Sequence, residues 1–332
     1  MKLENKTILV TGGAGFIGSH FVELVAQKNK VIVYDNFTSN VLSISDVRSL
    51  NPLRDIEIIS GDILDQKKLE KSLSGVDIVF HFAVACVRLS LSDESYVHEI
   101  NATGTLRTLL AAKKAGVKRF VYISSSEVYG TTHGDSIDEH HSIEPQTVYG
   151  MSKYMGELYA KHFNDIEKLP TMCIRPFNAY GPREHFDGVY GEVIPRFAIQ
   201  ALSGKQPTIF GDGSQTRDFT YVKDTAMGIA KASECDELLG DVVNIAYGKE
   251  VSVATVASLI SKQAGLPYNP IYLDARPNDV DRLAANTQKA KKLLAYTPSV
   301  TIEEGITTYV SWLKATYPNI DSLLAHIPKT NW

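Results

Sequence analysis

The chain has 332 residues, a formal net charge of −4 at pH 7 and 44% hydrophobic residues, which is enough to bury an ample core in one large domain or in two lobes. The slightly negative charge excludes the basic surface typical of nucleic-acid-binding proteins, and no apolar run is long enough to span a bilayer. The three cysteines, Cys86, Cys173 and Cys235, are too few and too far apart for a disulfide framework or a zinc site. They favour a reducing cytoplasm, and the early start of the first strand pattern leaves no room for a signal peptide.

Residues 7–10 form an apolar run rich in β-branched side chains, which predicts a buried strand. Three glycines and an amphipathic helical pattern follow, and strand, glycine turn and helix together are the context of a dinucleotide-binding fingerprint. Gly12 would allow the tight turn, Gly15 the approach of backbone to a pyrophosphate, and Gly18 close packing of helix and strand. The phosphates would lie at the helix N-terminus, where free N–H groups favour an anion. The residues predicted to contact the cofactor here are Gly12, Gly15, Phe16, Ile17 and Gly18.

A second predicted strand, 30–34, ends in Asp35, about 20 residues beyond the glycine turn, where an acid would hold a ribose 2′-hydroxyl. Asn36 and Phe37 follow, and neither can bind a 2′-phosphate, so NAD is predicted rather than NADP. Asp62 and Ile63 come after a third strand at 56–59. The Asp62 carboxylate would accept a hydrogen bond from the adenine amino group, or would instead cap the helix predicted for 66–73.

A fourth predicted strand, 76–81, is followed by small residues against which a flat cofactor can lie. His81 has no partner at metal-ligand spacing and is predicted to be structural. The residues of this segment assigned to the cofactor site are Phe82, Ala83 and Val84.

The next predicted helix, 96–115, carries Asn101, which we also assign to the cofactor site, and a strand at 117–123 follows. Strands alternate with helices throughout this half, which implies βαβ units and a parallel sheet covered on both faces. Right-handed crossovers build a doubly wound α/β fold with its ligand at the carboxyl ends of the strands.

The candidate chemistry follows that last strand. Tyr149 and Lys153 lie four residues apart on a predicted helix and share one face, so Lys153 would lie near Tyr149 and under a cofactor ribose. The charges of Lys153 and of an oxidised nicotinamide would lower the pKa of Tyr149, which makes Tyr149 the predicted general base for a substrate hydroxyl. The preceding Ser-Ser-Ser-Glu run would complete the proton path, and its members Ser124, Ser125, Ser126 and Glu127 complete the catalytic set.

In combination, these motifs resemble the extended short-chain dehydrogenase/reductase superfamily, in its nucleotide-sugar epimerase/dehydratase group, over nearly the whole chain. The resemblance implies a Rossmann-type sheet, NAD as cofactor and a nucleoside-diphosphate sugar as substrate. The segments that carry it are 11–18, 124–130, 149–153, 175–183, 191–195, 210–222 and 276–279.

The same resemblance assigns the substrate site. Asn178 would donate its amide to the diphosphate, or would form only a turn before the next glycine. Arg217 and Arg276 are planar cations suited to bidentate phosphate contacts, and the resemblance implies that both lie near the diphosphate. The histidines His140, His141 and His185 have no companion ligand set, so no metal is assigned. Further substrate contacts are implied for Arg88, for Val193, for Phe210 against the base and for Asp279 at the nucleoside ribose.

The resemblance also implies the domain organisation. Residues 1–180 would form the NAD-binding lobe, to which 218–227 and 241–246 return, and 181–216 and 248–332 would form a smaller, discontinuous substrate lobe. Because many relatives pair through a four-helix bundle, a homodimer is expected, with neither a nucleic acid nor a membrane as partner.

The resemblance implies that Tyr149 removes the proton of the sugar 4-hydroxyl, which leaves three fates for the 4-keto sugar. These are 4-epimerisation, loss of water across C5 and C6, and loss of a C6 carboxyl. Related 4,6-dehydratases carry Asp-Glu where this chain has Ser126-Glu127, so the proton donor for dehydration is missing.

Two further features bear on the choice. Ser-Glu resembles uronate decarboxylases, and the segment with Arg88 resembles one in uronate 4-epimerases, whereas His185 stands where some of those carry a carboxylate-binding arginine. A UDP-hexose 4-epimerase is therefore favoured, and a UDP-glucuronate decarboxylase and a 4,6-dehydratase remain open. A non-catalytic NAD-binding regulator is the remote alternative, because both Tyr149 and Lys153 are present.

Overall fold

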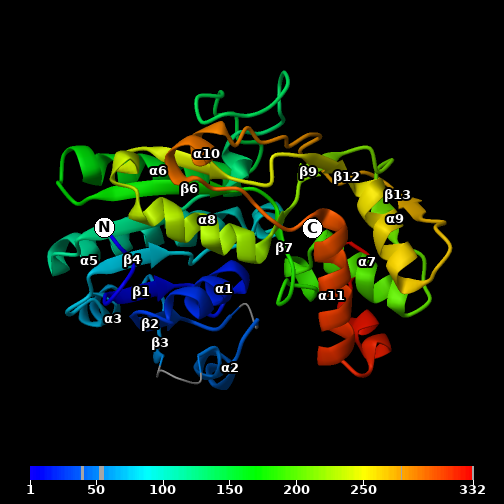
Figure 1. Cartoon of the computed structure of the whole chain (residues 1–332), viewed down its shortest axis with the longest axis horizontal. Helices are drawn as coiled ribbons and strands as arrows, with labels where there is room; N and C mark the ends of the chain where they lie inside the picture. Colours follow the sequence, from blue (N-terminus) through cyan, green and yellow to red (C-terminus); the bar gives the residue numbers. More distant parts are fainter. Residues whose placement is uncertain (39–40, 52–55, 278, 331–332) are drawn as a thin grey trace.

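The computed structural model describes residues 1–38, 41–51, 56–277 and 279–330, so Asn278 of the predicted 276–279 motif lies outside the described residues. In this part of the chain, seven parallel strands form one sheet in the order β11-β6-β5-β4-β1-β2-β3 (Figure 1). Strand order reverses between β1 and β4, so the loops after these strands diverge and leave a crevice at their carboxyl ends. The predicted doubly wound α/β fold is confirmed. The strands are β1 (Thr7–Thr11), β2 (Lys30–Asp35), β3 (Glu57–Ser60), β4 (Ile78–His81), β5 (Arg119–Ile123), β6 (Thr171–Pro176) and β11 (Val242–Ile245).

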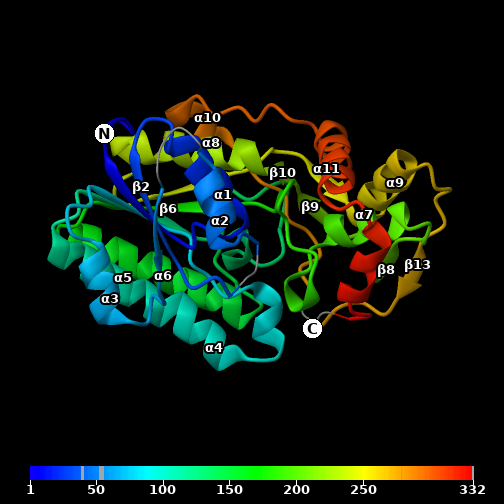
Figure 2. The same ribbon diagram turned by 90° about the horizontal axis from the view of Figure 1, so that it is seen from below.

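Helices cover both faces of this sheet (Figure 2). Along β1, Ile8 and Val10 pack into the core on one face and Leu9 into the core on the other, as expected for a strand that is apolar on both sides. Full burial of each such side chain contributes about 1.5–3 kcal/mol to folding. One face carries α1 (Phe16–Val25), α8 (Val222–Glu234) and α10 (Gln288–Leu294), and the other α3 (Gln66–Ser72), α5 (Thr105–Ala115) and α6 (Val148–Asp165).

A second lobe, on the right of Figure 1, surrounds a core of its own that includes Ile194, Phe197 and Tyr309. Its helices are α7 (Val193–Leu202), α9 (Val253–Ala264) and α11 (Ile302–Thr316). Three short two-stranded ladders lie outside the large sheet in the described ranges: β7 (Ala179–Tyr180) with β10 (Thr220–Tyr221), β8 (Thr208–Phe210) with β13 (Ile271–Leu273), and β9 (Thr216–Asp218) with β12 (Glu250–Ser252).

The division into lobes stays a prediction, with one amendment from the packing. Strand β11 lies in the large sheet, and α8, which packs on α1, continues to Glu234, beyond the returning segment 218–227. Ala290 and Leu294 of α10 join the same core, although the sequence assigned them to the substrate lobe. We therefore propose that α10 belongs to the NAD-binding lobe.

The helix predicted for 96–115 is not uniform. It begins as α4 (Glu94–His98), widens into a π-helical turn (Glu99–Gly104) and continues as α5. The shorter elements are α2 (Ile44–Ser49), the 3₁₀ turns Val87–Leu91, Ser126–Val128, Gly188–Tyr190 and Asp236–Leu238, and the 3₁₀ segment Ile320–His326.

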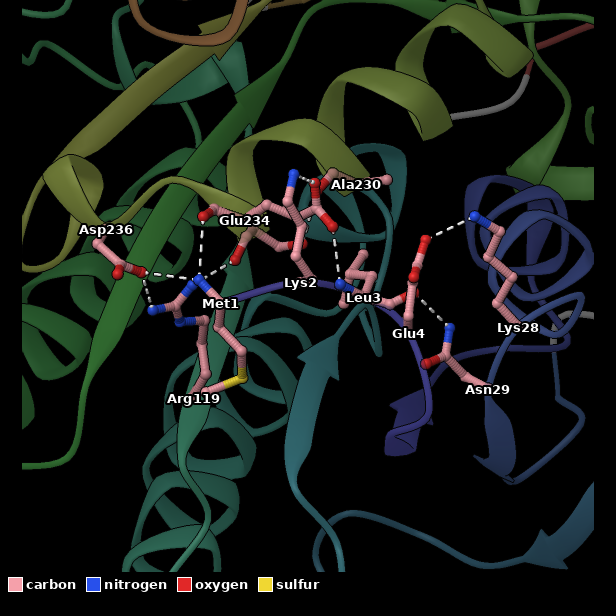
Figure 3. A network of polar contacts seen from close by, with 11 residues as sticks. Met1, Lys2, Leu3, Glu4, Lys28, Asn29, Arg119, Ala230, Glu234 and Asp236 are labelled. Atoms are coloured by element: carbon pink, nitrogen blue, oxygen red, sulfur yellow. Dashed lines mark hydrogen bonds and ion pairs between the residues drawn. The ribbon is translucent and has the colours of Figure 1, made fainter.

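The first residues of the chain are tied to the end of α8 (Figure 3). The Leu3 N–H donates to Glu234 Oε1 at 2.7 Å, and the Met1 amino group donates to Asp236 Oδ1 at 3.0 Å. Arg119 of β5 also pairs with Asp236, so these contacts join the N-terminal segment, α8 and the sheet. Within the described ranges, none of the helices has the length and apolarity that a bilayer crossing demands.

Candidate active site

A cavity of about 420 Å³ lies at the carboxyl ends of the sheet strands, where the two lobes meet. Of the residues that the sequence assigned to catalysis, cofactor or substrate, all but Asn101 line it. The structure thus brings together residues from position 12 to position 279, and their individual roles remain predictions.

The glycine turn between β1 and α1 is shaped by close backbone contacts. Gly12 has φ +68°, and a Cβ there would lie 2.6 Å from the Ala83 nitrogen. A Cβ at Gly18 would lie 2.2 Å from the carbonyl oxygen of Gly12, so Gly18 lets α1 pack against the turn itself. Gly15 caps α1 without a side chain, which leaves the first N–H groups of the helix for an anion. This cradle fits the pyrophosphate of a dinucleotide.

Asp35 ends β2 and braces that turn. Its Oδ2 accepts a hydrogen bond from the Ala14 N–H at 2.9 Å and its Oδ1 accepts one from the Phe37 N–H at 2.8 Å. Burial raises the pKa of Asp35, and these backbone donors oppose the rise. Each carboxylate oxygen keeps lone-pair capacity for a ribose hydroxyl, which is consistent with the predicted role.

Asp62 lines the adjoining part of the cavity and does not cap α3, so the alternative role weighed for it is wrong. The cap is Asp65, whose Oδ1 accepts a hydrogen bond from the Lys68 N–H at 3.1 Å. Asp62 Oδ2 instead accepts a hydrogen bond from Asn36 Nδ2 at 3.3 Å.

Asn101 is the one assigned residue that does not line the cavity, so the structure gives no support to its predicted cofactor contact. Its side chain is buried in the π-helical turn, where it accepts a hydrogen bond from the Ala85 N–H at 2.8 Å and donates to the Ala85 carbonyl at 3.0 Å. It also donates to Ser152 Oγ at 3.2 Å. Asn101 therefore fixes the loop after β4 to α6 and acts behind the cavity wall.

Tyr149 and Lys153 lie on the first turns of α6, which begins here because Thr147 Oγ1 accepts a hydrogen bond from the Gly150 N–H. Lys153 is buried, and its Nζ donates to the carbonyl oxygen of Ile123 at 2.5 Å. Burial lowers the pKa of Lys153 to about 7.

The Tyr149 pKa is raised, mainly by burial, and a hydrogen bond with Ser125 opposes the rise. The predicted lowering of this pKa is therefore not produced by the protein's own groups. Charge from an oxidised cofactor would have to supply it.

The serine run forms the wall facing Tyr149. Ser125 Oγ accepts a hydrogen bond from the Glu127 N–H at 3.2 Å and so starts the 3₁₀ turn Ser126–Val128. Burial raises the pKa of Glu127, and the charge of Arg217 opposes the rise. Among the described residues, Ser124 Oγ and Asn178 Oδ1 are buried without a hydrogen-bond partner, and such groups favour a ligand that pairs with them.

Arg88 is not a free cation. Its guanidinium makes two hydrogen bonds to the carboxylate of Glu192, at 2.5 and 3.1 Å, and donates to the backbone carbonyls of Val189 and Tyr190. The substrate contact expected for Arg88 stays a prediction, and the structure shows four hydrogen bonds of Arg88 directed to the segment before α7.

The opposite end of the cavity carries three arginines. Arg217 pairs with Asp279 at 2.8 Å, and Arg276 lies 4.0 Å from the same carboxylate. Arg196 lies over the ring of Phe210, 5.0 Å from its centroid, and burial lowers the pKa of Arg196 to about 10. This cationic wall fits a diphosphate.

Sequence reasoning missed Arg196, Glu184 and Glu192 as lining residues. Arg196 follows Val193 by three positions on α7, and that helical spacing could have placed the two on one face. Glu192 lies in the segment 191–195 that carries the resemblance, but nothing in the neighbouring sequence indicates that it pairs with Arg88. In the described ranges, no group of three or more His, Cys, Asp or Glu side chains is arranged to hold a metal ion.

Comparison with known proteins agrees with this geometry. Residues 8–246 match the model of the NAD dependent epimerase/dehydratase family. A putative UDP-glucose 4-epimerase of Methanocaldococcus jannaschii is 37% identical over 92% of this chain and 98% of its own length. A UDP-N-acetyl-alpha-D-glucosaminuronate decarboxylase of Bacillus cytotoxicus is 32% identical over 93% of this chain and 98% of its own.

Among solved structures, a UDP-glucuronic acid 4-epimerase of Bacillus cereus in complex with UDP-glucuronic acid and NAD superposes with a TM-score of 0.87. It is 32% identical and covers 94% of this chain and 100% of its own. The chain belongs to the NAD dependent epimerase/dehydratase family, and it is an enzyme whose cofactor is NAD.

Proposed function

We propose that this protein is a nucleotide-sugar 4-epimerase of the UDP-hexose type that works through a 4-keto intermediate. The observation that carries the proposal is Tyr149, which lies partly buried in the cavity wall in hydrogen-bond contact with Ser125, together with Ser126 at the position of the missing acid. Tyr149 accepts the proton of the sugar 4-hydroxyl, and Ser125 shares that proton through their hydrogen bond. NAD, when bound, supplies the chemistry of accepting and returning the C4 hydride.

We assign the two ends of the cavity to the cofactor and to the substrate according to the groups that line each end. The turn with Gly12, Gly15 and Gly18 would hold the pyrophosphate of NAD, and Asp35 the adenosine ribose. Arg217 and Arg276 would bind the substrate diphosphate at the opposite end. Other proposed cofactor contacts are Phe16, Ile17, Asn36, Asp62, Ile63, Phe82, Ala83 and Val84, and other proposed substrate contacts are Asn178, Val193, Phe210 and Asp279.

Two related reactions compete with 4-epimerisation. A UDP-glucuronate decarboxylase is favoured by Ser126-Glu127 and by the similarity to the Bacillus cytotoxicus decarboxylase. It is disfavoured because Arg88 is already paired with Glu192. A 4,6-dehydratase would need a proton donor for the departing O6, and Ser126 is a poor acid.

The fate of a C4 label separates the three reactions. Incubation with UDP-glucose carrying deuterium at C4 should give UDP-galactose that retains the label at C4. Deuterium at C6 would indicate a dehydratase, and carbon dioxide released from UDP-glucuronate would indicate a decarboxylase. A panel of UDP-, dTDP-, GDP- and CDP-sugars tests the nucleotide in the same assay.

We further propose a homodimer in the cytoplasm. The helices α4, α5 and α6 expose apolar side chains on one side of the sheet, which supports pairing with a second copy. The three cysteines are free thiols, which is consistent with a reducing compartment. Light scattering of the purified protein tests the dimer. The exposed apolar residues are Tyr96, Leu110, Met151, Met155 and Leu158.

A further inference from the structure

The sugar end of the cavity is crossed by an ion pair between the two lobes. Arg88, in the 3₁₀ turn after β4, is only 4% exposed and directs four hydrogen bonds to the segment 189–192. Its partner Glu192 keeps 39% of its side chain exposed, so the carboxylate remains accessible from the cavity that it lines. The hydrogen bonds of Arg88 thus go to other groups of the protein, whereas Glu192 lines the cavity and is partly exposed.

Glu192 lines the same cavity as the catalytic residues and the arginine wall. Its negative charge acts on Tyr149, on Glu127 and on Arg276. A sugar whose 4-hydroxyl reaches Tyr149 while its diphosphate lies on the arginines would then lie within reach of that charge. A fixed carboxylate there can accept hydrogen bonds from sugar hydroxyls and repels a second carboxylate.

The other cations near this position are also unsuited to a sugar carboxylate. Burial lowers the pKa of His185, so its ring is neutral at pH 7. Lys153 donates to the Ile123 carbonyl on the cofactor side. Arg276 also acts on Glu192, but it is assigned to the diphosphate. A carboxylate brought beside Glu192 would lose part of its hydration and meet a negative charge, which is costly.

We propose, building on the nucleotide-sugar function proposed above, that the Arg88–Glu192 pair selects a hexose with an uncharged C6 over a hexuronate. Glu192 is the specificity-determining residue, because it pairs with Arg88 and adds a negative charge beside that arginine. Selectivity then depends on a contact between two lobes, made by residues 104 positions apart.

The test measures binding rather than turnover, in the NAD-loaded Tyr149→Phe variant, by titration calorimetry with UDP-glucose and with UDP-glucuronate. UDP-glucose should bind at least tenfold more tightly. Adding Glu192→Gln removes the charge and one acceptor of Arg88, so the preference should fall about tenfold or more. Arg88→Gln leaves Glu192 unpaired and should strengthen the preference, so the two changes move the ratio in opposite directions.

Glu184→Gln is the matched control. Glu184 lines the same cavity, but its carboxylate accepts a hydrogen bond from the Gly181 N–H and receives none of the four hydrogen bonds that Arg88 makes, so the ratio should change far less than with Glu192→Gln. Thermal unfolding and NAD content verify that each variant is folded. The proposed selectivity is overturned if the two nucleotide sugars bind equally well, or if UDP-glucuronate binds more tightly. It is also overturned if the ratio of the two affinities changes in neither variant. Both outcomes count even where C4 labelling supports epimerisation. Label at C6 overturns the epimerase even where the ratio holds.

Discussion

Tyr149 and Lys153 lie one turn apart on the same face of α6, yet they bond to different partners. Tyr149 contacts Ser125, whereas Lys153 Nζ donates to the carbonyl oxygen of Ile123 on β5. The lysine is therefore anchored to the sheet, and the tyrosine is anchored to the serine wall. The group expected to transfer the proton, Tyr149, and the lysine on the next turn of the helix, Lys153, are therefore held by different parts of the protein.

Replacing the tyrosine tests its role as the base. Tyr149→Phe should keep the fold and the NAD content but lower turnover by about 10²–10⁴-fold, the usual contribution of a general base. Tyr154→Phe is the control, because Tyr154 lies on the same helix and does not line the cavity. Steady-state kinetics with UDP-glucose measures both, and near-normal turnover of Tyr149→Phe would reject the assignment.

The burial of Lys153 should make the free energy of unfolding of the protein depend on pH. Burial lowers its pKa from 10.5 to about 7, so between these values the unfolded chain binds more protons than the folded chain, and stability rises with pH. Lys153→Met removes this dependence. After removal of NAD, the variant should unfold at a higher temperature than the parent at pH 7, and the difference should shrink toward pH 9.

The control for this series is Lys161→Met, which changes an exposed lysine of the same helix. Its difference from the parent protein should stay constant across the same pH range. A constant or widening difference for Lys153→Met would mean that Lys153 keeps an ordinary pKa in the folded chain.

Cofactor choice should follow Asp35. The double change Asp35→Ser with Asn36→Arg should weaken NAD binding and improve NADP binding, because it replaces a repelling carboxylate by a cation beside the 2′-phosphate. Since Asp35 also accepts hydrogen bonds from Ala14 and Phe37, the melting temperature should fall too. Calorimetry with both cofactors measures the switch, and Asn36→Arg alone is the control. Unchanged NAD affinity would show that Asp35 does not contact the ribose.

Gly18→Ala tests the cradle of the pyrophosphate. The added Cβ would lie 2.2 Å from the Gly12 carbonyl oxygen, so α1 must move away from the turn, and NAD content should fall at least tenfold. The Cβ of Gly15→Ala would lie 3.2 Å from the same oxygen, a milder clash, so this variant should lower the melting temperature less than Gly18→Ala while it still obstructs the phosphates. Equal NAD content in Gly18→Ala and the parent would contradict the proposed position of the cofactor.

Most of the fold could be predicted from the sequence, because buried parallel strands and their crossover helices leave strong local patterns. Two features of the site could not. The position of Asn101 behind the cavity wall, bonded to Ala85, could not be predicted, because the pattern 96–115 is that of an ordinary helix and gives no sign of the π-helical turn. The engagement of Arg88 by Glu192 was invisible because the pair joins two lobes across 104 positions. Local spacing predicts neighbours along a helix, and it carries no information about such distant contacts.

The hydrophobic interior is divided, since the cores on the two faces of the sheet are separate from the one around α7, α9 and α11. Substitutions inside the smaller core can accumulate with little effect on the framework that holds NAD. Changes in the smaller core can therefore reshape the side of the cavity that includes Val193, Arg196 and Phe197 while the packing of the large sheet stays the same.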